Sequence, residues 1–76
     1  MVLACVLVFC EPGKFEEVLR NVKELQFVKR AFSVLGRCDV VAEIDAPTLE
    51  QVGLTVYEIA RIDGVTSTET LVETIM

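Results

Sequence analysis

The sequence predicts an α+β fold in which two helices cover one face of a four-stranded antiparallel sheet. Apolar or alternating runs typical of strands interchange with runs that have the 3.6-residue period of a helix. Their order is strand, helix, strand, strand, helix, strand, and 76 residues suffice for one domain only, spanning 1–76. Only residues 36–38 separate the two middle strands, so these strands form an antiparallel hairpin.

The first half of the chain contains a central strand, a helix and an edge strand. Residues 2–9 are apolar at both parities, which is typical of a strand in the middle of a sheet. Residues 14–25 follow a helical period. We expect the next strand over residues 27–35, with Val28 and Arg30 on one face and with basic side chains marking a sheet edge. The expected helical stripe consists of Phe15, Val18, Leu19, Val22 and Leu25.

The second half repeats the pattern. Residues 39–46 alternate, so that Val40, Ala42, Ile44 and Ala46 share one face. Thr48 and Gln51 have the spacing of a capping box, and Asp63-Gly64 ends the helix that follows. Residues 65–75 form a threonine-rich last strand. The expected buried stripe of the helix holds Leu49, Val52, Val56, Ile59 and Ala60, with Gly53 allowing a close approach to the sheet.

The order of elements fixes the topology. Each strand-helix-strand half is a crossover and should be right-handed, so both helices lie on the same face. The first and third strands are then central. This is the ferredoxin-like βαββαβ sandwich.

Composition and charge exclude several classes of function. The net charge is −5 and the seven basic residues form no stripe, so we expect no direct DNA binding and no anionic membrane surface. The apolar run 2–9 is far shorter than the about 20 residues that span a bilayer. With no export signal, we expect a cytoplasmic protein with reduced cysteines.

The uncovered face of the sheet predicts self-association. The first strand is apolar on both sides, so the face without helices would expose a larger apolar patch than monomers usually show. Burial of a few hundred Å² at roughly 25 cal/mol per Å² amounts to several kcal/mol, which a domain this small needs. We therefore expect a sheet-to-sheet dimer or a larger ring, in preference to a monomer.

The sequence offers little for catalysis or metal binding. Cys5 and Cys10 have opposite strand parity, and there is no histidine and no CxxC pair, so we expect no metal site. Cys38 lies in the hairpin, where it could be exposed, but no histidine can activate it. Gly36 and Gly64 stand alone and make no phosphate cradle, so we expect no cofactor and no enzyme. The acidic row of Asp39, Glu43 and Asp45 is typical of a solvated or interface rim.

The hairpin and the last strand hold the remaining candidates. Gly36 lets backbone approach a ligand closely, and Asp39 can accept from an ammonium group. The hairpin amides and the hydroxyls of Ser67, Thr68 and Thr70 can hold a carboxylate, so the set matches an α-amino acid. We expect the two segments to be far apart within one subunit and to meet only between subunits. From spacing alone, a simple turn and the strand preference of threonine explain the same residues.

Two segments carry a resemblance to a known family. The runs Gly36-Arg37-Cys38-Asp39-Val40-Val41 and Asp63-Gly64-Val65-Thr66-Ser67-Thr68-Glu69-Thr70-Leu71-Val72 flank a helix. In this order they resemble the effector-binding RAM domain of the Lrp/AsnC transcriptional regulators. The family pattern is a glycine, two variable residues, an aspartate and a hydrophobic strand, then Gly-Val and alternating threonines. The resemblance covers essentially the whole chain.

The resemblance implies an amino-acid-binding, oligomeric module that regulates transcription. Such domains dimerise through their sheets, and the dimers form rings, commonly octamers, with amino acids bound between dimers. By this resemblance, Gly36 and Asp39 would contact the ligand from the hairpin, and Thr68 and Thr70 from the last strand. We also expect Arg37 and Ser67 to belong to the ligand site. Arg37 and Cys38 stand where the family often has an acidic and an aromatic residue, so the resemblance does not specify which effector binds.

The resemblance also concerns partners. Full-length members carry an N-terminal helix-turn-helix, whereas this chain enters its first strand at Val2. We therefore expect a stand-alone domain without helix-turn-helix that acts by co-assembly with full-length regulators. Two alternatives remain: an ACT-like amino-acid-binding module, which pairs edge to edge, and a dimeric α/β-barrel enzyme with its chemistry between the sheets.

Overall fold

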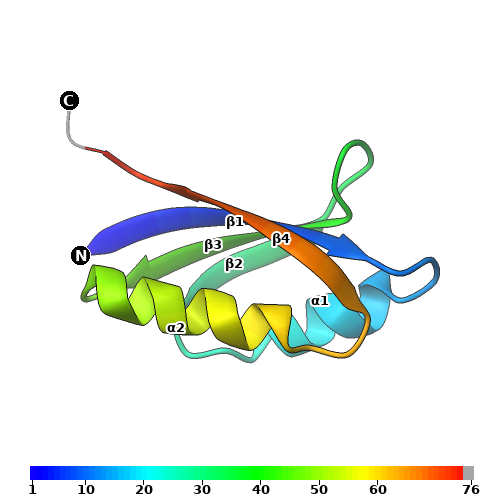
Figure 1. Ribbon diagram of the computed structural model, residues 1–76, viewed down its shortest axis with the longest axis horizontal. Helices are drawn as coiled ribbons and strands as arrows, with labels where there is room; N and C mark the ends of the chain where they lie inside the picture. The colour runs from blue at the N-terminus through cyan, green and yellow to red at the C-terminus, as the bar shows by residue number, and fades with distance from the viewer. Residues whose placement is uncertain (75–76) are drawn as a thin grey trace.

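A computed structural model describes residues 1–74 and has the predicted architecture. The chain runs through β1 (Val2–Cys10), α1 (Phe15–Lys23), β2 (Val28–Ser33), β3 (Val40–Ala46), α2 (Leu49–Ala60) and β4 (Val65–Val72). All neighbouring strands are antiparallel, in the order β2-β3-β1-β4. Both helices lie on one side of the sheet (Figure 1). The ferredoxin-like sandwich is thus confirmed, with the first and third strands central.

The hydrophobic core lies between the sheet and the helices. Val6 and Val8 of β1 are fully buried and face the same side as their ladder partners Ala42 and Val40 of β3. Each fully buried aliphatic side chain contributes about 1.5–3 kcal/mol relative to exposure. The helices complete this core with the buried residues Val18, Val22, Val52 and Ile59.

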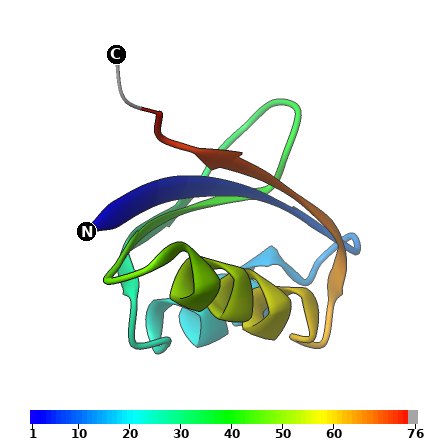
Figure 2. The ribbon, with the colours of Figure 1, turned by 60° about the vertical axis from the view of Figure 1, so that its left-hand side comes forward.

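The other side of the sheet carries no helix (Figure 2). Leu7 pairs with Val41, and Cys5 pairs with Glu43 on one side and with Leu71 on the other, so these side chains share this side. We call this surface the open face. It consists of Leu3, Cys5, Leu7, Phe9, Phe32, Val41 and Leu71 together with Arg30, Glu43, Asp45 and Glu69.

The edge strand β2 differs from the expectation. Val28 pairs with Ile44 and therefore faces the helices, whereas Arg30 pairs with Glu43 on the open face. The prediction that Val28 and Arg30 share a face is wrong, because the register shifts between them. A bulge of this kind adds one residue to a strand and reverses the faces of those beyond it.

Helix α2 is rotated relative to the predicted stripe. Its buried residues are Val52, Thr55 and Ile59, whereas Leu49, Gly53 and Ala60 are exposed. A Cβ at Gly53 would meet nothing within 4 Å, so the expected close approach to the sheet is wrong. Thr55 packs inward because its hydroxyl donates to the carbonyl oxygen of Gln51 at 2.8 Å.

The ends of α2 follow the sequence signals. Thr48 accepts from the N–H of Gln51 at 3.2 Å, as the capping box predicts. After the helix, Gly64 adopts a φ of +103° and lies against α1. Strand β4 ends at Val72, and the remainder of the predicted strand includes Ile75, which lies outside the described residues.

Candidate functional site

The hairpin between β2 and β3 rises from the open side of the sheet, away from the helices (Figures 1 and 2). Leu35 and Arg37 are exposed, and Gly36 has a φ of +143°, a conformation that favours glycine. Within residues 1–74, no hydrogen bond uses the N–H groups of Leu35, Gly36 or Arg37. Consecutive free amides of this kind can bind an anionic group.

Asp39 connects the hairpin to the central strand. Its Oδ2 accepts from the N–H of Cys10 at 2.8 Å, and its own N–H donates to the carbonyl oxygen of Val8 at 3.0 Å. A carboxylate has about four acceptor sites, so one bond leaves capacity for a ligand. The side chain also borders a hollow of about 340 Å³ under the hairpin. This hollow is lined by Phe15, Ser33, Val34, Leu35 and Asp39.

The hydroxyl residues of β4 divide between the two faces of the sheet. Ser67 pairs with Phe9 and is exposed on the open side. Thr68 and Thr70 pair with Val8 and Val6, so they face the helix side and are half-buried. The three hydroxyls expected to act together are therefore separated by the alternation of the strand.

The hairpin and β4 nevertheless lie at the same end of the sheet, with only β1 between them. Asp39 binds Cys10 from one side, and the hydroxyl of Thr66 donates to the carbonyl oxygen of Phe9 at 3.0 Å from the other. Neighbouring strands are about 4.8 Å apart, which puts the backbones of Asp39 and Ser67 about 10 Å apart. The separation is smaller than expected, but β1 still prevents contact between the two halves.

The residues around the hollow were not predicted, apart from Asp39. Phe15 fits the apolar stripe of α1, yet it begins the helix and is 41% exposed beside the hairpin. Ser33 and Val34 follow an ordinary strand pattern. No local signal marks these residues, because the hollow forms only where the hairpin passes the start of α1.

Each of the three cysteines is either buried or has a raised pKa. Cys38 is buried, with 7% of its surface exposed, which corrects the expectation of an exposed thiol in the hairpin. Burial, Glu43 and Cys38 raise the pKa of Cys5, and burial, Asp39 and Cys38 raise the pKa of Cys10. A raised pKa keeps a thiol protonated near neutral pH. In the described part of the chain, no group of three His, Cys, Asp or Glu side chains could hold a metal ion.

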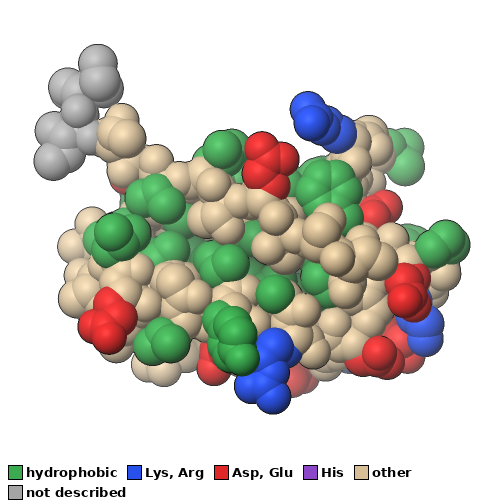
Figure 3. All heavy atoms as spheres, viewed as in Figure 1, with side chains coloured by type: hydrophobic (Ala, Val, Ile, Leu, Met, Phe, Trp, Pro, Cys, Tyr) green, Lys and Arg blue, Asp and Glu red, His purple; other side chains and the backbone are tan. Residues whose placement is uncertain are grey.

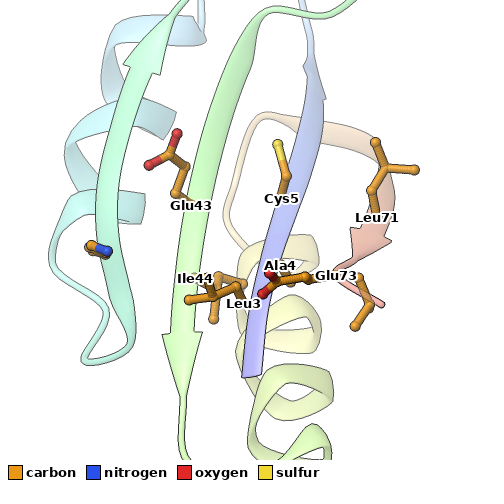
Figure 4. A pocket seen from close by; sticks show the side chains of 9 residues that line it. Leu3, Ala4, Cys5, Glu43, Ile44, Leu71 and Glu73 are labelled. Carbon is orange, nitrogen blue, oxygen red and sulfur yellow. The ribbon is translucent and has the colours of Figure 1, made fainter. Parts of the chain in front are cut away.

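A second hollow, of about 350 Å³, lies on the open face. Glu43, Cys5 and Leu71 border it from the adjacent strands β3, β1 and β4, and Leu3 lies at its lower end (Figure 4). Close by, Oδ1 of Asp45 is buried and has no hydrogen-bond partner within residues 1–74. A buried carboxylate oxygen in a protein usually accepts a hydrogen bond.

Within residues 1–74, no helix is both long and apolar enough to cross a membrane.

The chain is similar to several proteins of known structure. A protein from Thermus thermophilus is 28% identical, with a TM-score of 0.94, and the alignment covers 100% of this chain and 96% of that one. Escherichia coli AsnC is 20% identical, with a TM-score of 0.86 over 99% of this chain and 54% of its own.

A transcriptional regulator of Neisseria meningitidis, solved as a complex with L-methionine, is 14% identical with a TM-score of 0.82. The match covers 97% of this chain and 50% of the regulator. No curated protein matches the sequence significantly. Residues 3–74 match the family model of the Lrp/AsnC ligand-binding domain. Since this match spans nearly the whole chain, the protein belongs to the Lrp/AsnC family as a ligand-binding domain of the RAM type.

Proposed function

We propose that the domain binds an amino acid in the hollow beside Asp39 and modulates transcription through oligomeric assembly. The observation that carries this proposal is the position of Asp39, which borders the hollow at the base of the hairpin that contains the three free amides. A carboxylate and a row of N–H groups complement the ammonium and carboxylate groups of an α-amino acid. Phe15, Val34 and Leu35 offer apolar contacts to its side chain.

The positions of the hydroxyl residues support a site shared between subunits. Thr68 and Thr70 lie across β1 from Asp39 and on the helix side of β4, so they cannot reach a ligand that Asp39 of the same subunit holds. A neighbouring subunit could place its β4 beside the hairpin, which projects from the body of the domain (Figure 1). In this proposal Gly36, Arg37 and Asp39 of one subunit face Thr68 and Thr70 of the next.

The open face supports the sheet-to-sheet dimer. Leu3 is 39% and Leu71 54% exposed there, and the hollow between them is mainly apolar. A second copy would bury these side chains and could bring a donor to Oδ1 of Asp45. Such a dimer distinguishes the domain from an ACT-like module, which pairs through sheet edges or helices.

The regulatory role follows from the family. Family membership favours a regulator over an enzyme, and the raised pKa values of Cys5 and Cys10 do not favour a thiolate nucleophile. The regulators of Escherichia coli and Neisseria meningitidis are about twice as long as this chain, which matches 54% and 50% of them. We infer that the domain acts in the cytoplasm. It would bind to the RAM domains of full-length regulators and change the assembly of these regulators when the effector is bound.

Isothermal titration calorimetry with the proteinogenic amino acids tests the site. We expect at least one amino acid to bind the wild type and Asp39→Asn to weaken that binding 10-fold or more, because a hydrogen bond to a charged group is worth about 1.5–3 kcal/mol. Asparagine keeps an oxygen that can accept from Cys10, so the fold should survive. Asp63→Asn removes an exposed carboxylate in the turn before β4 and should leave the affinity unchanged.

Two results would contradict the proposal: no binding by any amino acid, or equal binding by the wild type and Asp39→Asn.

Co-assembly with full-length regulators needs a separate measurement. Native mass spectrometry of the domain mixed with a full-length Lrp/AsnC regulator should show hetero-oligomers. Unmixed species in the presence and absence of the bound amino acid would refute that part.

A further inference from the structure

The outward side of α2 carries four exposed residues in one line. Glu50, Leu54, Tyr57 and Arg61 stand at positions i, i+4, i+7 and i+11, which form one stripe along a helix. Leu54 is 58% and Tyr57 61% exposed. The buried residues of α2 lie on the opposite side of the helix. We call these four residues the outer stripe.

The solvent-exposed side of α1 differs from the outer stripe of α2. The exposed residues of α1 are mostly charged, among them Glu16, Glu17, Arg20 and Lys23. On α2, Leu54 and Tyr57 are exposed, and apolar side chains lie among charged ones along the lower edge of the molecule (Figure 3). Exposed apolar side chains that lie side by side on a helix can form part of a surface that binds a partner.

Gly53 is an independent sign of a close contact at this helix. It lies in the middle of α2 beside Tyr57, is exposed, and a Cβ there would meet nothing within 4 Å. Glycine is among the poorest helix formers, and nothing inside the domain requires it here. A partner whose backbone approaches α2 would explain its presence, because glycine permits the closest approach.

The outer stripe is complementary to itself in antiparallel orientation. A two-fold axis midway between Leu54 and Tyr57 places Leu54 against Tyr57 of the partner subunit. The same axis places Glu50 against Arg61 of the partner subunit, at both ends of the contact. Within residues 1–74 neither Glu50 nor Arg61 forms an ion pair. The Arg61 guanidinium lies over the Tyr57 ring, 5.6 Å from its centroid, which holds the charge on the stripe.

We propose that α2 pairs antiparallel with α2 of a second copy through the outer stripe. The helix has 12 residues and is about 18 Å long, so one such contact buries less than the about 1,200 Å² of a stable interface. It therefore acts on dimers formed through the open face, and in this respect the inference rests on the proposed function. Two different two-fold interfaces on one chain link dimers into larger assemblies.

Sedimentation velocity of the full chain with reversed charges tests this pairing. The wild type should form particles larger than a dimer, and Arg61→Glu or Glu50→Arg alone should stop assembly at the dimer, because like charges then meet at both ends. The double variant Glu50→Arg/Arg61→Glu should restore the larger particles. Both substitutions oppose the helix dipole, so a mere loss of helix stability would be worse in the double variant and would not be rescued.

Arg20→Glu on the exposed side of α1 makes the same charge change as Arg61→Glu and should leave the large particles intact. The inference is overturned if the wild type never exceeds a dimer, if Arg61→Glu keeps the large particles, or if the double variant fails to restore them while circular dichroism shows a folded chain. A wild type that stops at the dimer leaves the open-face dimer standing, and calorimetry tests amino-acid binding separately. Loss of amino-acid binding in the calorimetric test leaves the α2 pairing standing.

Discussion

The Asp39 carboxylate has both a structural bond and a proposed ligand contact, and substitutions can separate the two. Asp39→Ala leaves the N–H of Cys10 without its acceptor, so we expect the free energy of unfolding to fall by about 1–3 kcal/mol. Asp39→Asn keeps an acceptor and should lose less than about 1 kcal/mol. Urea denaturation followed by circular dichroism measures both. Equal losses in the two variants would mean that the bond to Cys10 contributes little.

Gly64 lies at the junction between α2 and β4, where both the backbone conformation and the close approach of α1 favour glycine. Its φ is +103°, and a Cβ would come within 3.1 Å of Cβ of Lys14, the N-cap of α1, and of Cγ2 of Val18 on α1. We expect Gly64→Ala to lower the free energy of unfolding by about 2–4 kcal/mol, from backbone strain and overpacking together.

Gly13→Ala is the matched control for Gly64. Gly13 has a φ of +81°, but a Cβ there would meet nothing within 4 Å. Only the conformational cost of about 1–2 kcal/mol should appear. Thermal or urea unfolding of the two variants then isolates the packing contribution, and similar losses would show that α1 does not press against Gly64.

At the level of elements, helix α2 differs most from its sequence pattern. The spacing of apolar residues predicts Gly53 on the buried stripe, but the structure exposes it. A substitution by alanine distinguishes the two placements. If Gly53 packed against the sheet, Gly53→Ala would be destabilising. With Gly53 exposed, we expect the free energy of unfolding to rise by about 0.5–1 kcal/mol, because alanine forms helix better.

This prediction concerns the folded subunit and is measured by urea denaturation at low protein concentration, where helix pairing contributes least. Thr48→Ala at the start of the same helix is a control of opposite sign. It removes the bond from the Gln51 N–H and should cost about 1 kcal/mol. A destabilised Gly53→Ala variant would contradict the placement of Gly53 on the exposed side of α2.

At the level of the whole molecule, the open face determines whether the protein is a monomer or a sheet-to-sheet dimer. Leu7 lies near its centre, on the central strand and opposite Val41. We expect Leu7→Glu to prevent the sheet-to-sheet dimer, because a carboxylate would be buried against an already acidic surface. Size-exclusion chromatography with light scattering should then give the 8.4 kDa monomer.

Leu54→Glu is the corresponding change on α2 and should leave the dimer intact, since Leu54 lies on the opposite side of the molecule. Circular dichroism checks that both variants fold. A dimer that persists in Leu7→Glu, or a wild type that remains monomeric, would contradict the sheet-to-sheet arrangement.

The fold could be predicted from the sequence because its signals are local and repeated. The apolar run of β1, the alternation of β3, the cap at Thr48 and the short hairpin around Gly36 each depend on neighbouring residues only. The handedness of the crossovers then leaves one arrangement of strands. The same local signals place Gly36, Arg37 and Asp39 in the hairpin, because a turn depends on neighbouring residues only.

Tertiary structure decided what these elements present to one another. The periodicity of the sequence predicts neither the bulge between Val28 and Arg30 nor the outward position of Gly53. Thr55 can face inward because its hydroxyl bonds to the carbonyl oxygen of its own helix. The hollow beside Asp39 needs the hairpin and the start of α1, which are distant in sequence. The chain's own pattern therefore determines the sandwich, whereas the shape of the site and the surfaces available to partners depend on how the layers meet.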